Sequence, residues 1–316
     1  MLSLLIRRGA FSLFSLAVVS AILFVLTRSI PDSPARIVLG PDATDAQVTQ
    51  FEHDNGLDRP VVVQYGVWAS NLVLRGDFGR SFVTGRSIDA QIVRTLPVTL
   101  ELVAIAFVAA LTLSLALGTI AAVMRDTVVD YAARLIGVLG VSVPGFWLAL
   151  VLILAFAVDR EWFPPGGVVP WSAGLGPHLN SIALPAFCIT IFYMAVLTRM
   201  TRSSLLDVLG QDFVRTARAT GLTRRRVLLY ALKNALVPVV TIAGMSFGYM
   251  FGMALIIEQV FNIDGMSRTL LNAIQLRDFV LVQGIVLMFT LVFTIANLLA
   301  DVVNGWLNPR LAMAGP

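Results

Sequence analysis

Residues Asp212–Pro238 read DFVRTARATGLTRRRVLLYALKNALVP, a strongly basic stretch that lies between long apolar runs. Positions 199–233 hold eight basic and two acidic residues, whereas the whole chain has 23 lysines and arginines. In the middle of the stretch, Ala217, Ala219 and Gly221 form a strip with almost no side chain. A basic helical hairpin with small residues, placed between apolar spans, indicates a docking surface.

Local signals within this stretch predict two helices joined by a tight turn. Asp212 is expected to cap a first helix over residues 213–220, since a short acidic side chain accepts bonds from free helical N–H groups. Gly221 suits the left-handed residue that ends a helix, and Leu222 can then fold back onto that helix. Thr223 is expected to cap the second helix, which runs into the next apolar stretch.

The arginines of this hairpin point to an acidic partner. Arg215 and Arg218 fall on a face beside the small-residue strip, and three more arginines, at positions 224–226, begin the second helix. Cations at a helix start are unfavourable by about 0.3–1 kcal/mol, so an acidic protein surface or lipid headgroups should compensate them. The positive-inside rule alone also explains basic residues here, but the small-residue strip adds nothing to topology and favours docking.

The composition predicts a membrane protein. Of the 316 residues, 57% are hydrophobic and 13% are charged, and the mean hydropathy is +0.84. A soluble globular protein carries about 25% charged residues, so this chain lacks the polar side chains to cover a water-facing surface. Its basic residues border apolar spans, which membrane topology explains without any nucleic-acid partner.

Several classes of site are excluded by residue counts. One cysteine, Cys188, permits no internal disulfide framework, and with two histidines a Cys/His zinc site is not expected. Lys233 is the one lysine and precedes Asn234, whereas a phosphate-binding loop needs Lys followed by Ser or Thr. If ATP drives this protein, ATP and Mg are bound by another subunit. We therefore expect no catalytic residue, metal site or cofactor in this chain.

Six apolar stretches are long enough to cross a bilayer. They cover about residues 9–28, 97–124, 133–158, 179–199, 235–258 and 279–303. Six spans put both termini on one side, and the basic cluster at 199–233 assigns that side to the cytoplasm. We expect an all-α membrane protein with a cytoplasmic hairpin at 202–234, a small helical extracytoplasmic segment at 29–94 and an outer loop at 159–178. Trp162 and Trp171 in that loop fit an aromatic belt or a partner contact.

The extracytoplasmic segment contains two expected helices. One covers Asp45–Asp54, with Thr44 or Asp45 as its N-cap and Gly56 as its stop. The other covers Pro60–Leu74. The apolar stripe expected on the second helix consists of Val63, Val67 and Leu74.

Charges and helix breakers within the spans favour structural roles. Glu101 is expected in the first turn of its helix, where the dipole favours an acid, and Glu258 and Asp301 lie near span ends. A proton- or sodium-coupled carrier usually keeps ionisable groups at the bilayer centre, so their absence there counts against that class. Pro144 and Pro185 are expected to kink their helices.

Span five is expected to combine close packing with a solute path. Gly244, Gly248 and Gly252 recur every four residues, a face that permits close helix packing. Large side chains on other faces are candidates to line the path, although such residues are more often plain core. The path candidates are Met245, Phe247, Tyr249 and Met250, together with Phe146 and Trp147 of span three.

Residues 215–222 (RTARATGL), followed by Asn234, Ala235 and Pro238, resemble the EAA-type coupling motif of ABC importer permeases. More narrowly, the chain is similar to the dipeptide/oligopeptide/nickel permease family along nearly its whole length. The other matching pieces are GLDRP at 56–60, QY at 64–65, GDFG at 76–79, TLEL at 99–102, SVPGFW at 142–147, LTRMTRS at 197–203, EQVF at 258–261, RD at 277–278, NLLAD at 297–301 and NPR at 308–310.

This resemblance implies a six-helix type I importer permease of the bacterial inner membrane, with peptides as the first expected solute and nickel, glutathione or oligosaccharides as others. The implied partners are a second homologous permease, two ATP-binding subunits, an extracytoplasmic solute-binding protein and membrane lipid. ATP and Mg would be held by the ATP-binding subunits. The residues that would couple to those subunits are Asp212, Arg215, Ala217, Arg218, Ala219, Gly221, Leu222, Arg224 and Arg225.

The chain departs from the family pattern in two places. A histidine is expected near Tyr230 and Ala231, and the spacing from Gly221 to Pro238 is one residue short. A Trp-Pro-Gly turn is expected after Phe261, where this chain has Asn-Ile-Asp-Gly. The alternative functions are a self-sufficient secondary carrier or channel that ATP does not drive, and a membrane-embedded enzyme, for which no nucleophile–base pair or metal cluster is present.

Overall fold

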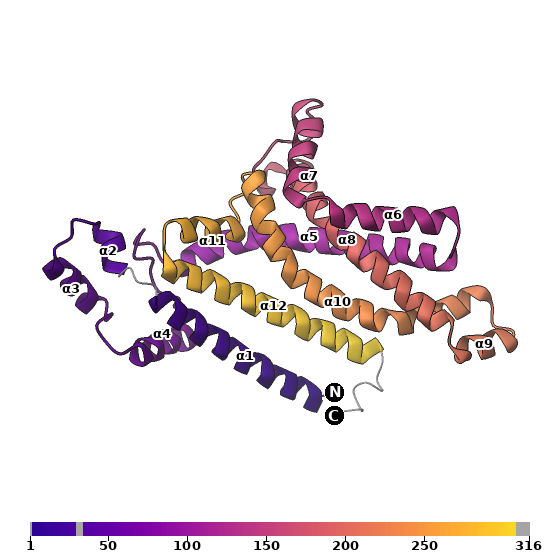
Figure 1. The fold of residues 1–316 in the computed structure, drawn as a ribbon, viewed down its shortest axis with the longest axis horizontal. Coiled ribbons are helices and arrows are strands. Elements are labelled where there is room, and N and C mark those ends of the chain that lie inside the picture. The colour runs from indigo at the N-terminus through magenta and orange to yellow at the C-terminus, as the bar shows by residue number, and fades with distance from the viewer. Residues whose placement is uncertain (1, 30–33, 308–316) are drawn as a thin grey trace. The chain divides into compact units, whose positions relative to one another are not determined.

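The structure is a computed structural model that describes residues 2–29 and 34–307. The NPR motif at 308–310 lies outside these described residues. The longest helices are α1 (Leu2–Arg28), α5 (Ile88–Val123), α8 (Leu175–Leu209), α10 (Arg224–Val260) and α12 (Phe279–Leu307), shown in Figure 1. Within the described residues, these five are long and apolar enough to cross a membrane. The all-α prediction is confirmed at this level.

A sixth crossing requires two helices to be counted as one broken span. α6 (Val128–Ser142) and α7 (Gly145–Leu152) are bent by 99° at their junction, and a π-helical turn, η1 (Ile153–Val158), follows. We expected a kink at Pro144 within one helix, and the structure shows a full break. Val143 is extended, as the residue before proline prefers. By contrast, α8 remains one helix across Pro185.

The chain forms two compact units, which are described separately. The first comprises the described parts of residues 1–9, 99–264 and 292–316, and the second comprises residues 10–98 and 265–291. In the first unit, α8 supplies many buried side chains and packs against α6 and α10. Close approach between α6 and α8 depends on a glycine, since an added Cβ on Gly140 would lie 2.9 Å from the Cβ of Ala195.

The second unit contains the short helices α2 (Pro34–Leu39), α3 (Asp45–Asp54), α4 (Val61–Arg75) and α11 (Met266–Gln275). The predicted bounds of α3 are confirmed, with Thr44 as N-cap in a capping box with Gln47. The core of the second unit is formed by Ile88, Met266 and Leu281 with other apolar side chains packed around them. The hydroxyl of Ser81 donates to the buried carboxylate of Asp278.

The predicted apolar stripe on α4 is wrong. Val63, Val67 and Leu74 are all exposed, whereas Tyr65 and Trp68 turn toward Phe24 of α1. The Phe24 and Trp68 ring centroids lie 5.8 Å apart. The aromatic rings therefore define the packed face of α4, because they bury more apolar area than valine side chains do.

The predicted place of Glu101 is also wrong. α5 begins at Ile88, so its first-turn acid is Asp89, and Glu101 lies in the helix interior. His178 Nε2 lies 2.7 Å from Glu101 Oε1, and His178 Nδ1 donates to the carbonyl oxygen of Val169 at 2.6 Å. The contact with His178, and not the helix dipole, therefore stabilises the carboxyl group of Glu101 at this position. α8 also begins at Leu175, inside the expected outer loop.

The glycine face of α10 is confirmed at two of its three positions. An added Cβ on Gly244 would lie 2.6 Å from the Cβ of Ala300, and one on Gly248 would collide with the ring of Phe293. Gly252 has nothing within 4 Å of its Cβ position, so its predicted packing role is wrong. Close contact between α10 and α12 therefore depends on Gly244 and Gly248.

These contacts predict different effects for one substitution at two glycines of α10. Gly244→Ala should lower the free energy of unfolding by roughly 1–3 kcal/mol, because the Cβ of Ala300 cannot rotate away. Gly252→Ala is the matched control and should be neutral or slightly stabilising, since alanine favours helices. Unfolding in mixed detergent micelles measures both. Equal stability of the two variants would contradict the assigned packing.

Candidate functional site

The predicted hairpin is present as a short helix between two long ones. α9 (Asp212–Ala219) lies between the end of α8 and the start of α10 in Figure 1. Gln211 is the N-cap and Asp212 is the first helical residue, so the predicted cap is wrong by one position. Asp212 still places its charge in the first turn, where the helix dipole favours it. Val214 is fully buried and fixes α9 to the fold.

The turn after α9 is the one predicted from Gly221. Gly221 has a φ of +82°, its N–H donates to the carbonyl oxygen of Arg218 at 3.0 Å, and the N–H of Leu222 donates to that of Ala217 at 3.2 Å. Together these two bonds form a Schellman motif, which satisfies carbonyl groups at the helix end. Thr223 then occupies the N-cap of α10, without a side-chain cap bond.

A local apolar cluster supports the hairpin from beneath. Its buried members come from the ends of α5 and α8 and from the start of α10. They are Ala122, Leu205, Val208, Ala231 and Ala235. The hydroxyl of Ser204 adds a buried bond to the carbonyl oxygen of Ala235, at 2.8 Å. α10 then continues as one helix through Pro238 to Val260, so its first turns are rigidly joined to its apolar part.

The outer face of α9 presents small and cationic side chains. Ala219 and Gly221 are exposed, and Ala217 is half-buried. Arg215 is 80% exposed and lies 3.6 Å from Asp212, a surface pair that contributes little to stability. Across the described residues, the three arginines at 224–226 have no ion-pair partner within the chain. Their charges therefore remain available to something outside it.

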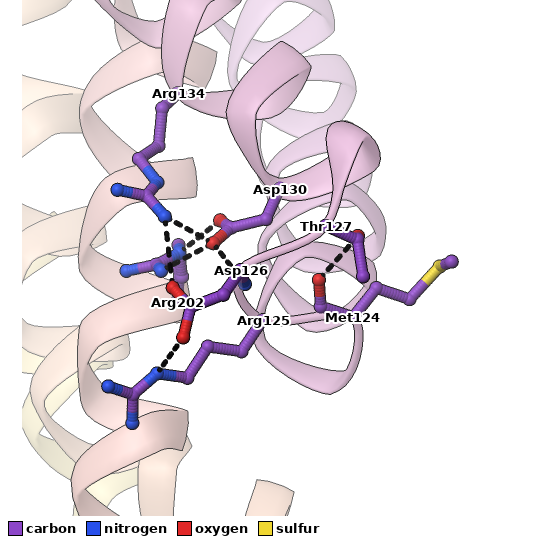
Figure 2. A network of polar contacts seen from close by, with 7 residues as sticks. All are labelled: Met124, Arg125, Asp126, Thr127, Asp130, Arg134 and Arg202. Carbon is purple, nitrogen blue, oxygen red and sulfur yellow. Dashed lines mark hydrogen bonds and ion pairs between the residues drawn. The ribbon is translucent and has the colours of Figure 1, made fainter.

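One arginine of the basic positions 199–233 faces inward. Figure 2 shows the carboxylate of Asp130, from α6, between the guanidinium groups of Arg134 and Arg202. Arg202 makes two bonds to it, Nε–Oδ1 at 2.6 Å and Nη2–Oδ2 at 2.8 Å, and Arg134 Nη2 lies 2.5 Å from Oδ2. The backbone N–H of Asp126 donates to the same oxygen at 3.0 Å. Asp130 is fully buried, so it accepts bonds from three donor residues where no water competes.

This carboxylate was missed in the sequence analysis. The spacing of Asp130 and Arg134 is the i,i+4 spacing of a helical ion pair, which was the available signal. Arg202 is one of the eight basic residues at positions 199–233 that indicate the cytoplasmic side, and in the structure it also joins α6 to α8. The network therefore fixes the end of α8 from which the hairpin departs.

The candidate residues of the solute path differ in how far their side chains are exposed. Phe146, Trp147, Met245 and Tyr249 are each 40% exposed or more, so their side chains are open to a solute or to a neighbouring chain. Phe247 packs edge-to-face on Phe107, with ring centroids 5.2 Å apart. Met250 is fully buried. In the outer loop, Trp162 and Trp171 are exposed, and Trp171 stacks on the buried ring of His178.

Nothing in the described part of the chain forms a group of three or more His, Cys, Asp or Glu side chains able to hold a metal ion. Cys188 is buried within α8.

Comparison with protein families identifies two matching models. Residues 114–313 match the binding-protein-dependent transport system inner membrane component, and residues 1–103 match the N-terminal membrane component of such systems. Together the two models cover nearly the whole chain.

Curated relatives match over the same extent. A putative peptide transport system permease of Brucella suis is 37% identical over 312 residues, which is 98% of this chain and 99% of that protein. A probable peptide ABC transporter permease of Sinorhizobium fredii is 34% identical over 308 residues, 97% and 98% of the two chains. The glutathione transport system permease of Escherichia coli (strain K12) is 37% identical over 313 residues, 98% and 99% of the two chains.

The buried carboxylate predicts a large difference between two neighbouring aspartates. Asp130→Asn should cost roughly 3 kcal/mol of unfolding free energy, since Arg202 would lose its partner in a largely buried position. Asp126→Asn removes an exposed carboxylate and should cost less than about 1 kcal/mol.

Unfolding in mixed detergent micelles again provides the measurement. Adding Arg202→Gln to Asp130→Asn should recover part of the loss, because no unpaired charge then remains buried. Equal costs for the two single variants would rule out the assigned role of Asp130.

Proposed function

This chain belongs to the family of binding-protein-dependent transport system inner membrane components, and on that premise we propose that it forms half of the translocation path of an ATP-driven peptide importer. It is a multi-pass protein of the bacterial inner membrane. We propose that a second homologous permease completes the path, that two ATP-binding subunits drive it and that a solute-binding protein delivers the solute. In this topology both termini and α9 are cytoplasmic, and six spans include the broken pair of α6 and α7.

The observation that carries this proposal is the exposed, rigidly held helix α9. Its exposed C-terminal end, at Ala219 and Gly221, has room for a close approach by another backbone, and the half-buried Ala217 adds little bulk one turn earlier. Arg215 and Arg218 flank it, and the arginines at 224–226 supply further positive charge. A partner that fits this surface has a groove for a small-residue helix and an acidic rim.

The contacts of α9 provide a route for the ATP-driven movement. The buried side chain of Val214 and the Schellman turn make α9 follow its partner as a unit. α9 packs on α10, and the apolar cluster joins α10 to α5 and α8, so a shift of α9 would reach α5 and α8 through α10. Because α10 is continuous, its movement reaches the exposed Met245 and Tyr249. We propose that this movement alternates the path between inward and outward access.

The proposed class of solute follows from the names of the curated relatives. Two of the relatives described above are named for peptide transport and a third for glutathione, which is itself a small peptide. We propose that Phe146, Trp147, Met245 and Tyr249 line the path, with Phe247 behind them. Large apolar side chains with few fixed polar partners suit solutes that vary in side chain, so selection would lie with the solute-binding protein. The exposed Trp162 and Trp171 are the proposed outer contacts of that protein.

Reconstitution into liposomes tests the importer. The tagged chain, purified with the subunits that accompany it, should take up labelled di- and tripeptides only with ATP, Mg and the solute-binding protein. Omission of any one should reduce uptake to background. Uptake by this chain alone, without ATP, would instead establish a self-sufficient carrier or channel and overturn the proposal.

A substitution on α9 tests the coupling surface. Ala219→Trp should abolish co-purification of the ATP-binding subunits or lower their stimulated ATPase activity at least tenfold, because the bulky ring blocks backbone approach. Ala46→Trp places the same ring on exposed α3, outside the proposed interface, and should change neither quantity. Membrane insertion of both variants should equal that of the wild type. Undiminished ATPase stimulation in Ala219→Trp would refute docking at α9.

A further inference from the structure

A groove of about 460 Å³ lies between α6 and α8, beside the Asp130 network and apart from the coupling face of α9. The two helices run antiparallel here, since Asp130 pairs with Arg202 at one end and Gly140 contacts Ala195 farther along. The groove therefore has two distinct ends. Its cationic end is formed by Arg134, Arg199 and Arg202, and its apolar end includes Val138, Val141 and Ala195.

The cationic end has unused positive charge. Arg134 and Arg202 share the carboxylate of Asp130, so two guanidinium groups face one buried acid. Arg199 is exposed, and among the described residues no ion pair or hydrogen bond of its side chain is found. Asp126 compensates part of the charge through Arg125 and Arg134. The arrangement leaves Arg199 free to bind an anion, with Arg134 beside it.

An unpartnered hydroxyl group in the wall of the groove is a second polar feature of the site. Thr198 lines it and is only 5% exposed, yet its Oγ1 atom has no hydrogen-bond partner among the described residues. Buried hydroxyl groups are nearly always bonded, because loss of their hydration costs free energy. In α8 the neighbouring Thr190 does bond to a carbonyl oxygen one turn earlier, at 2.8 Å. The Oγ1 atom is itself buried, so a rotation of the Thr198 side chain to another rotamer would bring this unused donor to a ligand in the groove.

We propose that this groove is a binding site for one anionic phospholipid of the bilayer. The phosphate lies against Arg199 and Arg134, and an ester or glycerol oxygen accepts the hydrogen bond of Thr198. An acyl chain lies along Val138 and Val141, which are 62% and 42% exposed. A molecule with a negative head and an apolar tail matches both ends of the groove, and basic pockets between membrane helices are known to suit such headgroups.

The apolar end separates this ligand from a soluble anion. Inorganic phosphate satisfies the arginines but leaves the valines uncovered, whereas a phospholipid covers both. The groove follows α6 from Ala133 to Ser142 and α8 from Ala195 to Arg202, and its arginines border the apolar faces of these helices. Lipid bound there braces the joint between α6 and α8, from which α8 continues to the hairpin. This proposal depends on membrane insertion and does not depend on the proposed solute or ATP-binding partners.

Native mass spectrometry of the full chain in detergent tests the site. The probes are phosphatidylglycerol, phosphatidylcholine and inorganic phosphate, each added at equal concentration. The wild type should retain phosphatidylglycerol in preference to phosphatidylcholine. Arg199→Gln should weaken phosphatidylglycerol binding about fivefold, which corresponds to about 1 kcal/mol for one basic residue near anionic lipid. Arg86→Gln, at an exposed arginine in the connection between α4 and α5, is the matched control and should leave phosphatidylglycerol binding unchanged.

Two further variants test the apolar end of the groove and the hydroxyl group of Thr198. Val138→Trp fills the groove and should reduce phosphatidylglycerol binding without altering the arginines. Thr198→Val should weaken binding while leaving the side-chain volume nearly unchanged. Three results would each overturn the lipid site. They are equal retention of both lipids by the wild type, unchanged phosphatidylglycerol binding in Arg199→Gln, and retention of inorganic phosphate as strong as that of phosphatidylglycerol.

A second permease chain over the groove is tested by cross-linking in membranes. Val138→Cys introduces an exposed thiol, and the chain's own Cys188 is buried. Labelling by a lipid-soluble maleimide, with no cross-link to another protein chain, supports lipid in the groove. An efficient cross-link to a neighbouring permease would show that protein covers this face and would overturn the proposal.

Discussion

The hydrocarbon interior of a bilayer provides no water to bond with backbone N–H and C=O groups, and the architecture of this chain follows from that constraint. A helix satisfies those groups within one segment, and helices of 27 to 37 residues recur along the described chain. Residues with left-handed backbone lie where the chain passes from one helix to the next. The non-glycine residues with positive φ in the described part are Asp126, Glu161, Asn262 and Arg277, and each lies in a connection between helices.

The same constraint determines how the helices associate. Lipid tails are as apolar as leucine side chains, so close packing and interhelical polar contacts must replace the hydrophobic effect. Gly244 and Gly140 allow backbones to approach, and Thr99 donates to the buried Glu258 at 2.5 Å. The break between Val143 and Pro144 is compatible with the same constraint, because its 99° bend separates two helices that each retain their internal hydrogen bonds.

Features set by neighbouring residues could be predicted from the sequence. The cap at Thr44 and the left-handed Gly221 depend on chemistry within five residues, and both are confirmed. Features that join distant elements could not be predicted. The valine stripe of α4 fails because Phe24, from α1, selects the aromatic face. Asp130 was missed because Arg202 lies 72 residues away, and no local pattern marks the pair. The coupling role of α9 remains a prediction, although its geometry is now described.

The arginines at positions 199–233 have two kinds of surroundings, and these predict different responses to salt. Arg202 is bound to a buried carboxylate, where salt has little access, so its contribution to the fold should persist at high ionic strength. Arg215 and the arginines at 224–226 are exposed, so their attraction for a partner weakens as salt is added and is largely screened beyond about 10 Å at 0.1 M salt. One segment thus combines a salt-insensitive joint with a salt-sensitive surface. If a partner docks on α9 as proposed, added salt should weaken that contact before it weakens the packing of α6 on α8.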